Sequence, residues 1–277
     1  MNGQCDAKLS LKSQQREEQE FWECLEKNGD DVELKYARDL PDDTPEYILR
    51  MISEFEMDVA DFCFNGAKGL VLDAGCGNGN LLFRSLPYLH AQYVGMDFSR
   101  NMLQRAACRA CDEISARFLQ GGIDRLPFKD QSFDRVVCSG VITCLPSMRD
   151  ARDALQEFHR VLKPGGELVV DFFNQISHFT LVRRHIFKED INPPEYISPH
   201  AFREELVKTG FDIQNYRGFD FKPYQGYLFM SDLRPIIDPC FIQERISRFL
   251  ESRVVPTLPQ VSLLGYRIYV KCRRRDV

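Results

Sequence analysis

The central part of the chain alternates between short apolar runs and longer segments in which apolar residues recur at helical spacing. The apolar runs predict strands over residues 70–74, 92–97, 116–120, 134–139 and 167–173. The segments between them predict helices over residues 79–86, 99–113 and 148–162. This alternation predicts an α/β fold in which a doubly wound, mostly parallel sheet carries helices on both faces.

Helical patterns also precede the alternation. Residues 13–27 carry an apolar stripe that includes Phe21 and Trp22, and a second stripe begins after Thr44, which is suited to cap a helix. We therefore expect an N-terminal helical extension over 1–67. The pair Phe21 and Trp22 either covers a ligand or anchors its helix to the core, and the pattern leaves both interpretations open.

The pattern is less regular after the fifth predicted strand. A strand over 211–217 and a last strand at "GYRIYVKC" (265–272) are expected there. The segments 174–197 and 218–262 are long for simple connections, and we expect them to form lids over the sheet. Residues 68–277 would then make up the main domain.

Composition is that of an ordinary soluble protein, with 44% hydrophobic and 28% charged residues among 277. We expect no membrane span, because no apolar run approaches the ~18 residues that one requires. A start without an apolar core and scattered cysteines favour a cytoplasmic location. The net charge of -5 argues against nucleic acid as a partner, and the basic run "KCRRR" (271–275) is expected to be a solvated tail.

The first predicted strand ends in "VLDAGCGNG", where a carboxylate is followed by glycines at alternate positions, Gly75, Gly77 and Gly79. Dinucleotide-binding turns have the spacing G-x-G-x-x-G, and a carboxylate beside a pyrophosphate would repel it. Asp73 in this turn instead suits a ligand with an ammonium group. The close glycines would let the backbone approach a bulky ligand.

A second carboxylate, Asp97, ends the next predicted strand, 18 residues after Gly79. In open α/β sheets a carboxylate at this place can accept both hydroxyls of a ribose. An Asp at a strand end often only caps the following turn, but Asp73 and Asp97 in this order favour a binding site.

Four stretches together resemble the class I S-adenosylmethionine-dependent methyltransferases: "VLDAGCGNG", "YVGMDFS", "LPFKDQSFDRVV" and "EFHRVLKPGGELVV". The resemblance is close over 68–173, and it is strongest to the small-molecule subgroup that includes quinone-biosynthesis enzymes. It implies a Rossmann-like sheet of seven strands whose last strand is antiparallel and lies beside 211–217. It also implies S-adenosylmethionine as cofactor, S-adenosylhomocysteine as product, and methyl transfer to a small-molecule acceptor.

The same resemblance implies the cofactor-binding residues, which are Asp73, Gly75, Cys76, Gly77, Asp97, Phe98, Met102, Gly122, Ile123, Ser139 and Gly140. Many members of the family have an acid that accepts the adenine amino group where this chain has Gly122. The sequence leaves open whether Asp124 reaches back to the adenine in place of that acid. Ser139 and Gly140 would present a backbone carbonyl to the ammonium group.

The sequence offers few other candidates for catalytic or metal-binding residues. His178 is the preferred general base, although a lone loop histidine is more often simply exposed, and some acceptors need no base. No metal site is expected, since "CRAC" (108–111) lacks a second pair of ligands. "INPPEY" (191–196) is interpreted as a plain turn. A catalytically silent methyltransferase-like partner subunit and a nicotinamide-dependent oxidoreductase remain as alternative functions.

Overall fold

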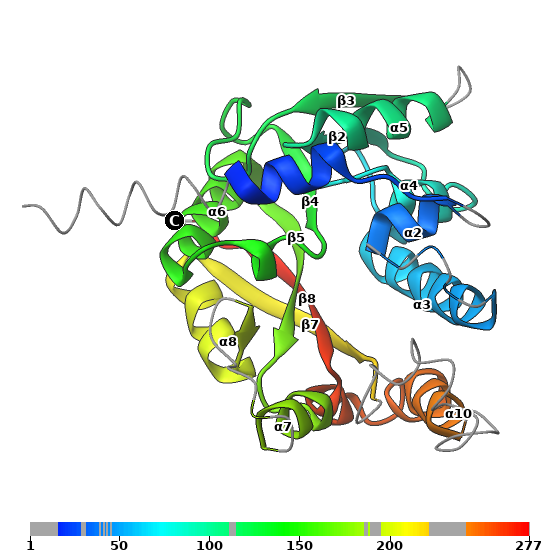
Figure 1. Cartoon of the computed structure of the whole chain (residues 1–277). Helices are drawn as coiled ribbons and strands as arrows, with labels where there is room; N and C mark the ends of the chain where they lie inside the picture. Colours follow the sequence, from blue (N-terminus) through cyan, green and yellow to red (C-terminus); the bar gives the residue numbers. More distant parts are fainter. Residues whose placement is uncertain are drawn as a thin grey trace, which may run out of the picture.

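Figure 1 shows the computed structural model of the chain, in which helices surround a single mixed sheet. The structure describes residues 16–28, 32–38, 40, 42, 44, 46–110, 115–185, 188, 195–221 and 242–276.

The sheet has the strand order β3-β2-β1-β4-β5-β8-β7, with β6 paired to β5 outside this path. The strands are β1 (Leu70–Ala74), β2 (Gln92–Asp97), β3 (Ala116–Gln120), β4 (Phe133–Cys138), β5 (Leu162–Asn174), β6 (Tyr196–Ile197), β7 (Phe211–Phe219) and β8 (Arg267–Arg274). Strands β1 to β6 pair in parallel, and β8 is antiparallel to its neighbours. The predicted doubly wound sheet with an antiparallel last strand is confirmed.

Strand β8 lies between β5 and β7, beside the strand predicted over 211–217. It runs opposite to the parallel strands, so its first residue, Arg267, pairs with Phe173 near the end of β5. The antiparallel strand therefore brings its beginning to the edge where the parallel strands end.

Two local predictions differ from the structure. Helix α6 (Met148–Val161) ends one residue early, and β5 begins at once with Leu162, which pairs with Phe133 across an irregular register. The sequence pattern predicts no helix or strand within 174–197, whereas this segment holds helix α7 (His178–His185) and the short strand β6. Strand β6 adds an eighth strand, and two residues are too few to give a periodic pattern.

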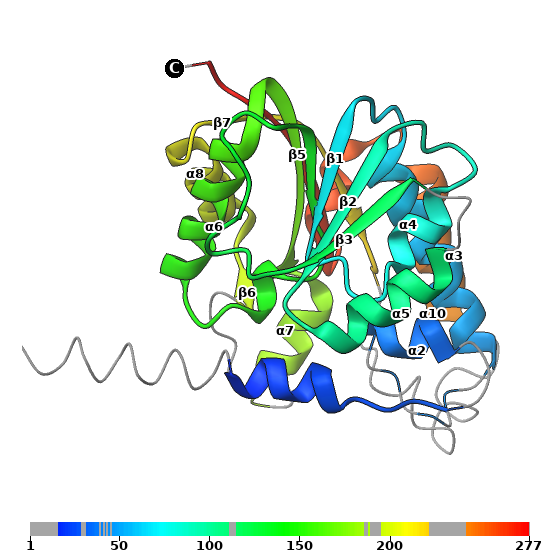
Figure 2. The same cartoon turned by 90° about the horizontal axis from the view of Figure 1, so that it is seen from above.

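Helices cover both faces of the sheet (Figure 2). On one face, α6 and α8 (Pro199–Lys208) bury a core that includes Leu155, Phe158 and Phe202. On the other, α3 (Glu46–Phe64) and α4 (Asn80–Ser85) pack on β1, β4 and β8. Helix α5 (Arg100–Ala110) lies beside α4 in Figure 2. Short helical turns are η1 (Ile142–Cys144), η3 (Leu250–Val254) and η4 (Pro259–Leu264).

The N-terminal segment forms a helix over 16–24 and helix α2 (Val32–Arg38) before α3 begins. In Figure 2 the helix over 16–24 lies near the start of α5. There, Glu23 accepts the backbone N–H groups of Arg100 and Asn101 at 2.6 and 3.0 Å. This segment is thus tied to the edge at which β2 ends.

Two expectations for the C-terminal region change. The segment 218–262 begins inside β7 and contains α10 (Ile242–Phe249), which is joined to α3 by an ion pair of Arg248 with Asp58 at 2.8 Å; residues 222–241 lie outside the described ranges. The expectation that "KCRRR" is a solvated tail is wrong: Arg274 and Arg275 donate to the carbonyl oxygens of Leu162 and Val207.

Candidate functional site

The turn that follows β1 is shaped by its glycines. Gly75 and Gly77 have φ angles of 85° and 54°, in the left-handed region that side chains rarely adopt. A Cβ on Gly75 would lie 2.2 Å from Cγ2 of Val141, so the turn after β1 touches the turn after β4. A Cβ on Gly77 would meet nothing within 4 Å, so this glycine faces open space. The turn is therefore packed on one side and open on the other.

Two carboxylates are buried beside this turn. Asp73 is 2% exposed and accepts the hydroxyl of Tyr93 at 2.7 Å. Asp97 is 6% exposed, and it accepts the backbone N–H groups of Gly77 and Ser99 at 2.8 and 2.9 Å. Within the described ranges, no Lys, Arg or His forms an ion pair with either carboxylate. In their ionised forms, these two carboxylates are therefore stabilised by hydrogen bonds and by no described cation.

Burial changes the acidity of both carboxyl groups. Removal from water disfavours the charged form and raises the pKa of Asp73 to about 7, although the Tyr93 hydrogen bond opposes this shift. Burial also raises the pKa of Asp97 to about 6, against the hydrogen bonds from Ser99 and Gly77. A cationic ligand would stabilise the ionised form of each group.

The residues after β2 form a second wall of the site. Phe98 is half-buried, and its carbonyl oxygen accepts the side-chain amides of Gln120 at 3.0 Å and Gln19 at 3.4 Å. Met102 is buried on α5. Gln19 therefore brings the N-terminal helix over 16–24 to the end of β2, next to Asp97. On this helix, Trp22 donates its indole N–H to Glu18 at 3.0 Å, and the rings of Phe21 and Trp22 pack edge to face with centroids 5.2 Å apart.

The predicted adenine end lies after β3. Ile123 is buried in the core, whereas Gly122 is exposed. A Cβ on Gly122 would lie 2.6 Å from Oδ1 of Asp124, so the Asp124 carboxylate stands beside the position where many relatives have an acid. That Asp124 takes over the role of this acid stays a prediction.

Cys76 takes a structural place in the turn. Its buried thiol packs against Gly95 of β2, where an added Cβ would lie 2.8 Å from Sγ. Burial raises the pKa of this thiol well above its usual value. Cys76 therefore shapes the turn as a neutral side chain.

Sequence reasoning missed a buried ion pair at the end of β4. Asp171 of β5 accepts both Arg267 of β8 and the backbone N–H of Gly140, and Arg267 also reaches Ser139. Asp171 and Arg267 are 96 residues apart and each lies in an apolar strand pattern. The only signal that could have marked them was a charge placed within each apolar run.

His178, the predicted general base, follows β5. It is the exposed first residue of α7, and none of the described residues hydrogen-bonds its ring. The structure therefore places it past the carboxyl end of β5 without a group that would orient it.

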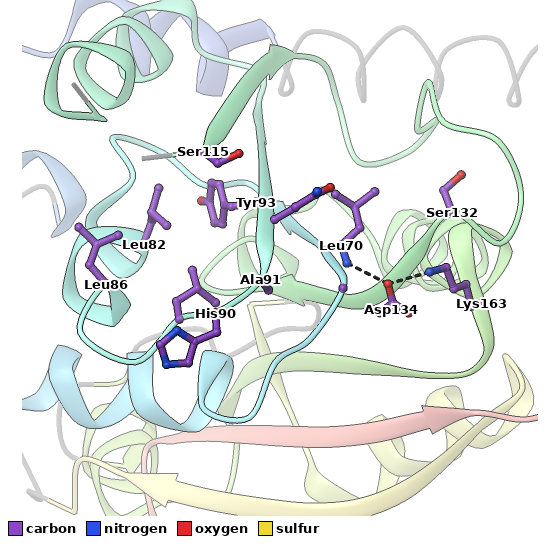
Figure 3. Close-up of a pocket in the computed structure, with 13 residues that line it drawn as sticks. Leu70, Leu82, Leu86, His90, Ala91, Tyr93, Ser115, Ser132, Asp134 and Lys163 are labelled. Atoms are coloured by element: carbon purple, nitrogen blue, oxygen red, sulfur yellow. Dashed lines mark hydrogen bonds and ion pairs between the residues drawn. The ribbon is translucent and has the colours of Figure 1, made fainter. Parts of the chain in front are cut away.

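The cavity in Figure 3 lies at the opposite edge of the sheet. It has a volume of about 750 Å³ and opens among the first residues of β1, β2 and β4, including Leu70, Tyr93 and Asp134. A second, largely apolar cavity of about 620 Å³ lies between α8 and the sheet and includes Phe172, Ile176 and Leu263. The Figure 3 cavity is therefore separate from the glycine turn.

The fold is a Rossmann-like sheet with a glycine turn and two buried carboxylates at the ends of β1 and β2. Comparison with known proteins shows which domain this is. Residues 71–166 match the family described as "Methyltransferase domain". With the sequence motifs and the sheet topology, this identifies the domain as that of a class I S-adenosylmethionine-dependent methyltransferase.

Similar proteins include the ubiquinone/menaquinone biosynthesis C-methyltransferase UbiE of Desulfotalea psychrophila, 40% identical over 111 residues, which are 36% of this chain and 40% of that protein. The bovine (Bos taurus) "Probable tRNA methyltransferase 9B" is 28% identical over 164 residues, 59% of this chain and 34% of that protein. The chain thus spans well under half the length of these two curated relatives.

Among solved structures, the magnesium protoporphyrin IX methyltransferase of Synechocystis PCC 6803, with bound SAH, superposes with a TM-score of 0.59. The match covers 94% of this chain and 99% of that one at 15% identity, so it shows the shared fold.

The residues present fit the family's cofactor. S-adenosylmethionine carries an ammonium and a sulfonium group, and the site offers two buried carboxylates that no described cation neutralises. It also offers open space above Gly77, which any larger residue would fill. Charge and shape therefore both agree with this cofactor. No described helix is long and apolar enough to cross a membrane.

Proposed function

We propose that this protein transfers a methyl group from S-adenosylmethionine to a small-molecule acceptor. The observation that carries the proposal is the pair of buried, unneutralised carboxylates, Asp73 and Asp97, on either side of the open Gly77 turn. A nicotinamide-dependent oxidoreductase is disfavoured by the glycine spacing and by the family match over 71–166.

When bound, S-adenosylmethionine supplies a methyl group that its sulfonium has already activated. The work left to this chain is to align the acceptor and to exclude water. Asp97 would hold the ribose hydroxyls, Asp73 would face the ammonium group, and Phe98 and Met102 would flank the nucleoside. The intact set of carboxylates and glycines supports an active enzyme over a silent partner subunit.

The described basic residues support a small acceptor over a nucleic acid. The densest basic run, 271–275, belongs to the fold: Arg274 and Arg275 donate to backbone carbonyls, and Arg275 pairs with Asp212 at 3.3 Å. Binding to polynucleotides requires Lys and Arg side chains that are free to neutralise phosphates. The apolar cavity beside Ile176 has the volume of an ordinary small-molecule site.

A tRNA acceptor is the second candidate, because one relative carries the name of a tRNA methyltransferase. Both candidates can be tested together by incubating the purified chain with methyl-labelled cofactor and either a metabolite extract or total tRNA. Label recovered in low-molecular-weight material that depends on Asp97 would support the proposal. Label retained on tRNA would favour the second candidate, and no transfer to any acceptor would favour the silent subunit.

A further inference from the structure

The buried ion pair at the carboxyl edge joins three strands. Asp171 of β5 is 1% exposed and Arg267 of β8 is 5% exposed. One carboxylate oxygen, Oδ2, accepts Nε of Arg267, and the other accepts the backbone N–H of Gly140 at 2.6 Å. Asp171 therefore fixes the turn after β4 to both β5 and β8.

The other residue of that turn is held by the same strands. The hydroxyl oxygens of Ser139 and Tyr269 lie 2.8 Å apart, and Nη2 of Arg267 donates to Ser139 Oγ at 3.4 Å. A Cβ on Gly140 would lie 2.9 Å from Nη2 of Arg267, so the guanidinium covers this glycine. Ser139 and Gly140 are thus clamped by side chains from β5 and β8.

The clamped turn lies against the glycine turn of the cofactor site. Val141 fills the space beside Gly75, so a shift of the turn after β4 would displace the turn after β1. A backbone N–H only donates, so the backbone groups that this turn can offer a cation are its carbonyl oxygens, and the contact of Asp171 with the N–H of Gly140 sets their direction. A cationic amino-acid end of a ligand would therefore depend on how the turn is oriented.

We infer that Asp171 and Arg267 are positioning residues, which act through Ser139 and Gly140 to orient the amino-acid end of the cofactor. The inference rests on the proposed function. Because Arg267 neutralises Asp171, the pair adds no net charge near the ammonium group, and Asp73 remains the attracting carboxylate. The role of the pair is therefore geometric.

The test compares two ligands by calorimetry: S-adenosylhomocysteine, and 5′-methylthioadenosine, which lacks the amino-acid end. In the variants Asp171→Asn and Arg267→Met we expect S-adenosylhomocysteine to bind about tenfold more weakly, as for loss of one charge-assisted hydrogen bond. Binding of 5′-methylthioadenosine should stay unchanged, and it also reports that the nucleoside site is folded. Arg267→Lys, which keeps the charge, should recover part of the affinity.

The matched control is Asp134→Asn. Asp134 is the second residue of β4 and lies at the opposite end of that strand. Its carboxylate likewise accepts one backbone N–H, from Leu70 at 2.8 Å, and one cation, Lys163 at 2.7 Å (Figure 3). Affinity for both ligands should be unchanged in this variant.

The outcomes distinguish failure of the positioning role from failure of the proposed function. Equal losses for both ligands in Asp171→Asn, or no loss for either, would overturn the positioning role while the cofactor site stands. Failure of the unmodified protein to bind either ligand would overturn the proposed function, and the positioning role with it.

Discussion

The backbone N–H of Gly77 donates to Oδ2 of Asp97 at 2.8 Å, joining the glycine turn after β1 to the end of β2. The second oxygen of Asp97 is held by the N–H of Ser99. The carboxylate is therefore fixed across the turn by two backbone groups, in the place where ribose hydroxyls are expected.

Replacing Asp97 by Ala should remove most of the affinity for S-adenosylmethionine and its product. The loss of a charge-assisted contact to two hydroxyls costs about 2–3 kcal/mol, or roughly 30- to 150-fold in the dissociation constant. Calorimetry with S-adenosylhomocysteine measures it. Asp130→Ala, which removes an exposed carboxylate paired with Arg160, should leave the affinity unchanged. Normal binding by Asp97→Ala would rule out this ribose site.

Gly77→Val should abolish cofactor binding and leave a soluble, folded protein, because the side chain would occupy the open space above the turn. Gly66→Val is a close control: Gly66 has a φ of 70°, and its Cβ would also meet nothing within 4 Å. Both variants carry the strain of a positive φ, about 1–3 kcal/mol each. Thermal melting should show similar losses of stability, with binding lost only in Gly77→Val. If both variants bind normally, this is not the cofactor turn.

Cofactor affinity should rise with pH between about 5 and 8 and then level off. The ligand requires ionised carboxylates, and burial raises the pKa of Asp97 to about 6 and that of Asp73 to about 7. Calorimetry in buffers of different ionisation enthalpy should detect protons released on binding near pH 6. In Tyr93→Phe the rise should move to higher pH, because the hydrogen bond that lowers the pKa of Asp73 is lost.

The raised pKa of Asp73 also makes the free energy of unfolding depend on pH. The folded state binds more protons than the unfolded state between the ordinary carboxyl pKa and about pH 7, so the contribution of Asp73 to stability falls as pH rises through this window. Asp73→Asn should flatten that part of the pH profile of the unfolding free energy. An unchanged profile would contradict the raised pKa.

Glu56→Gln should lower the free energy of unfolding by about 2 kcal/mol. Glu56 on α3 is 2% exposed and binds Arg38, Arg84 and the side-chain amide of Asn80. Breaking a buried pair costs ~3–5 kcal/mol, and the partial exposure of both arginines reduces this. Urea denaturation measures the change. Glu46→Gln, at the exposed start of the same helix, should be neutral.

His178→Ala should lower kcat about 10²-fold or more, with little effect on cofactor affinity, if His178 is the general base. His185 ends the same helix, so His185→Ala serves as the control. Equal, small changes in both variants would show that the acceptor loses its proton without His178.

The parallel part of the fold, from β1 to β5, could be predicted because its strands are apolar runs and helical patterns lie between most of them. The motif residues Asp73, Gly75, Gly77 and Asp97 could be predicted too, since consecutive parallel strands end at one edge. The pairing of Asp171 with Arg267 could not, because nothing local in either strand specifies a partner 96 residues away. Strand β6 is set by its pairing with β5 and leaves no pattern of its own.

The N-terminal contacts were hidden for a similar reason. Asn78 inside the glycine turn donates to the backbone and the carboxylate of Glu33, and Glu33 also pairs with Arg105. In the sequence, each of these is an ordinary polar residue. Their role depends on tertiary packing, which periodicity does not report.

The position of β8 inside the sheet, next to the edge strand β7, bears on how the chain folds. β8 follows all the other strands in sequence, yet it lies between β5 and β7, and it pairs with β5 about 100 residues after that strand has been made. Pairings of such long sequence separation close slowly. Until they close, the edges of β5 and β7 stand unpaired, and the turn after β4 lacks Arg267. We therefore expect the nascent chain to acquire its cofactor-binding geometry only when β8 inserts, with unpaired strand edges at risk of aggregation before that step.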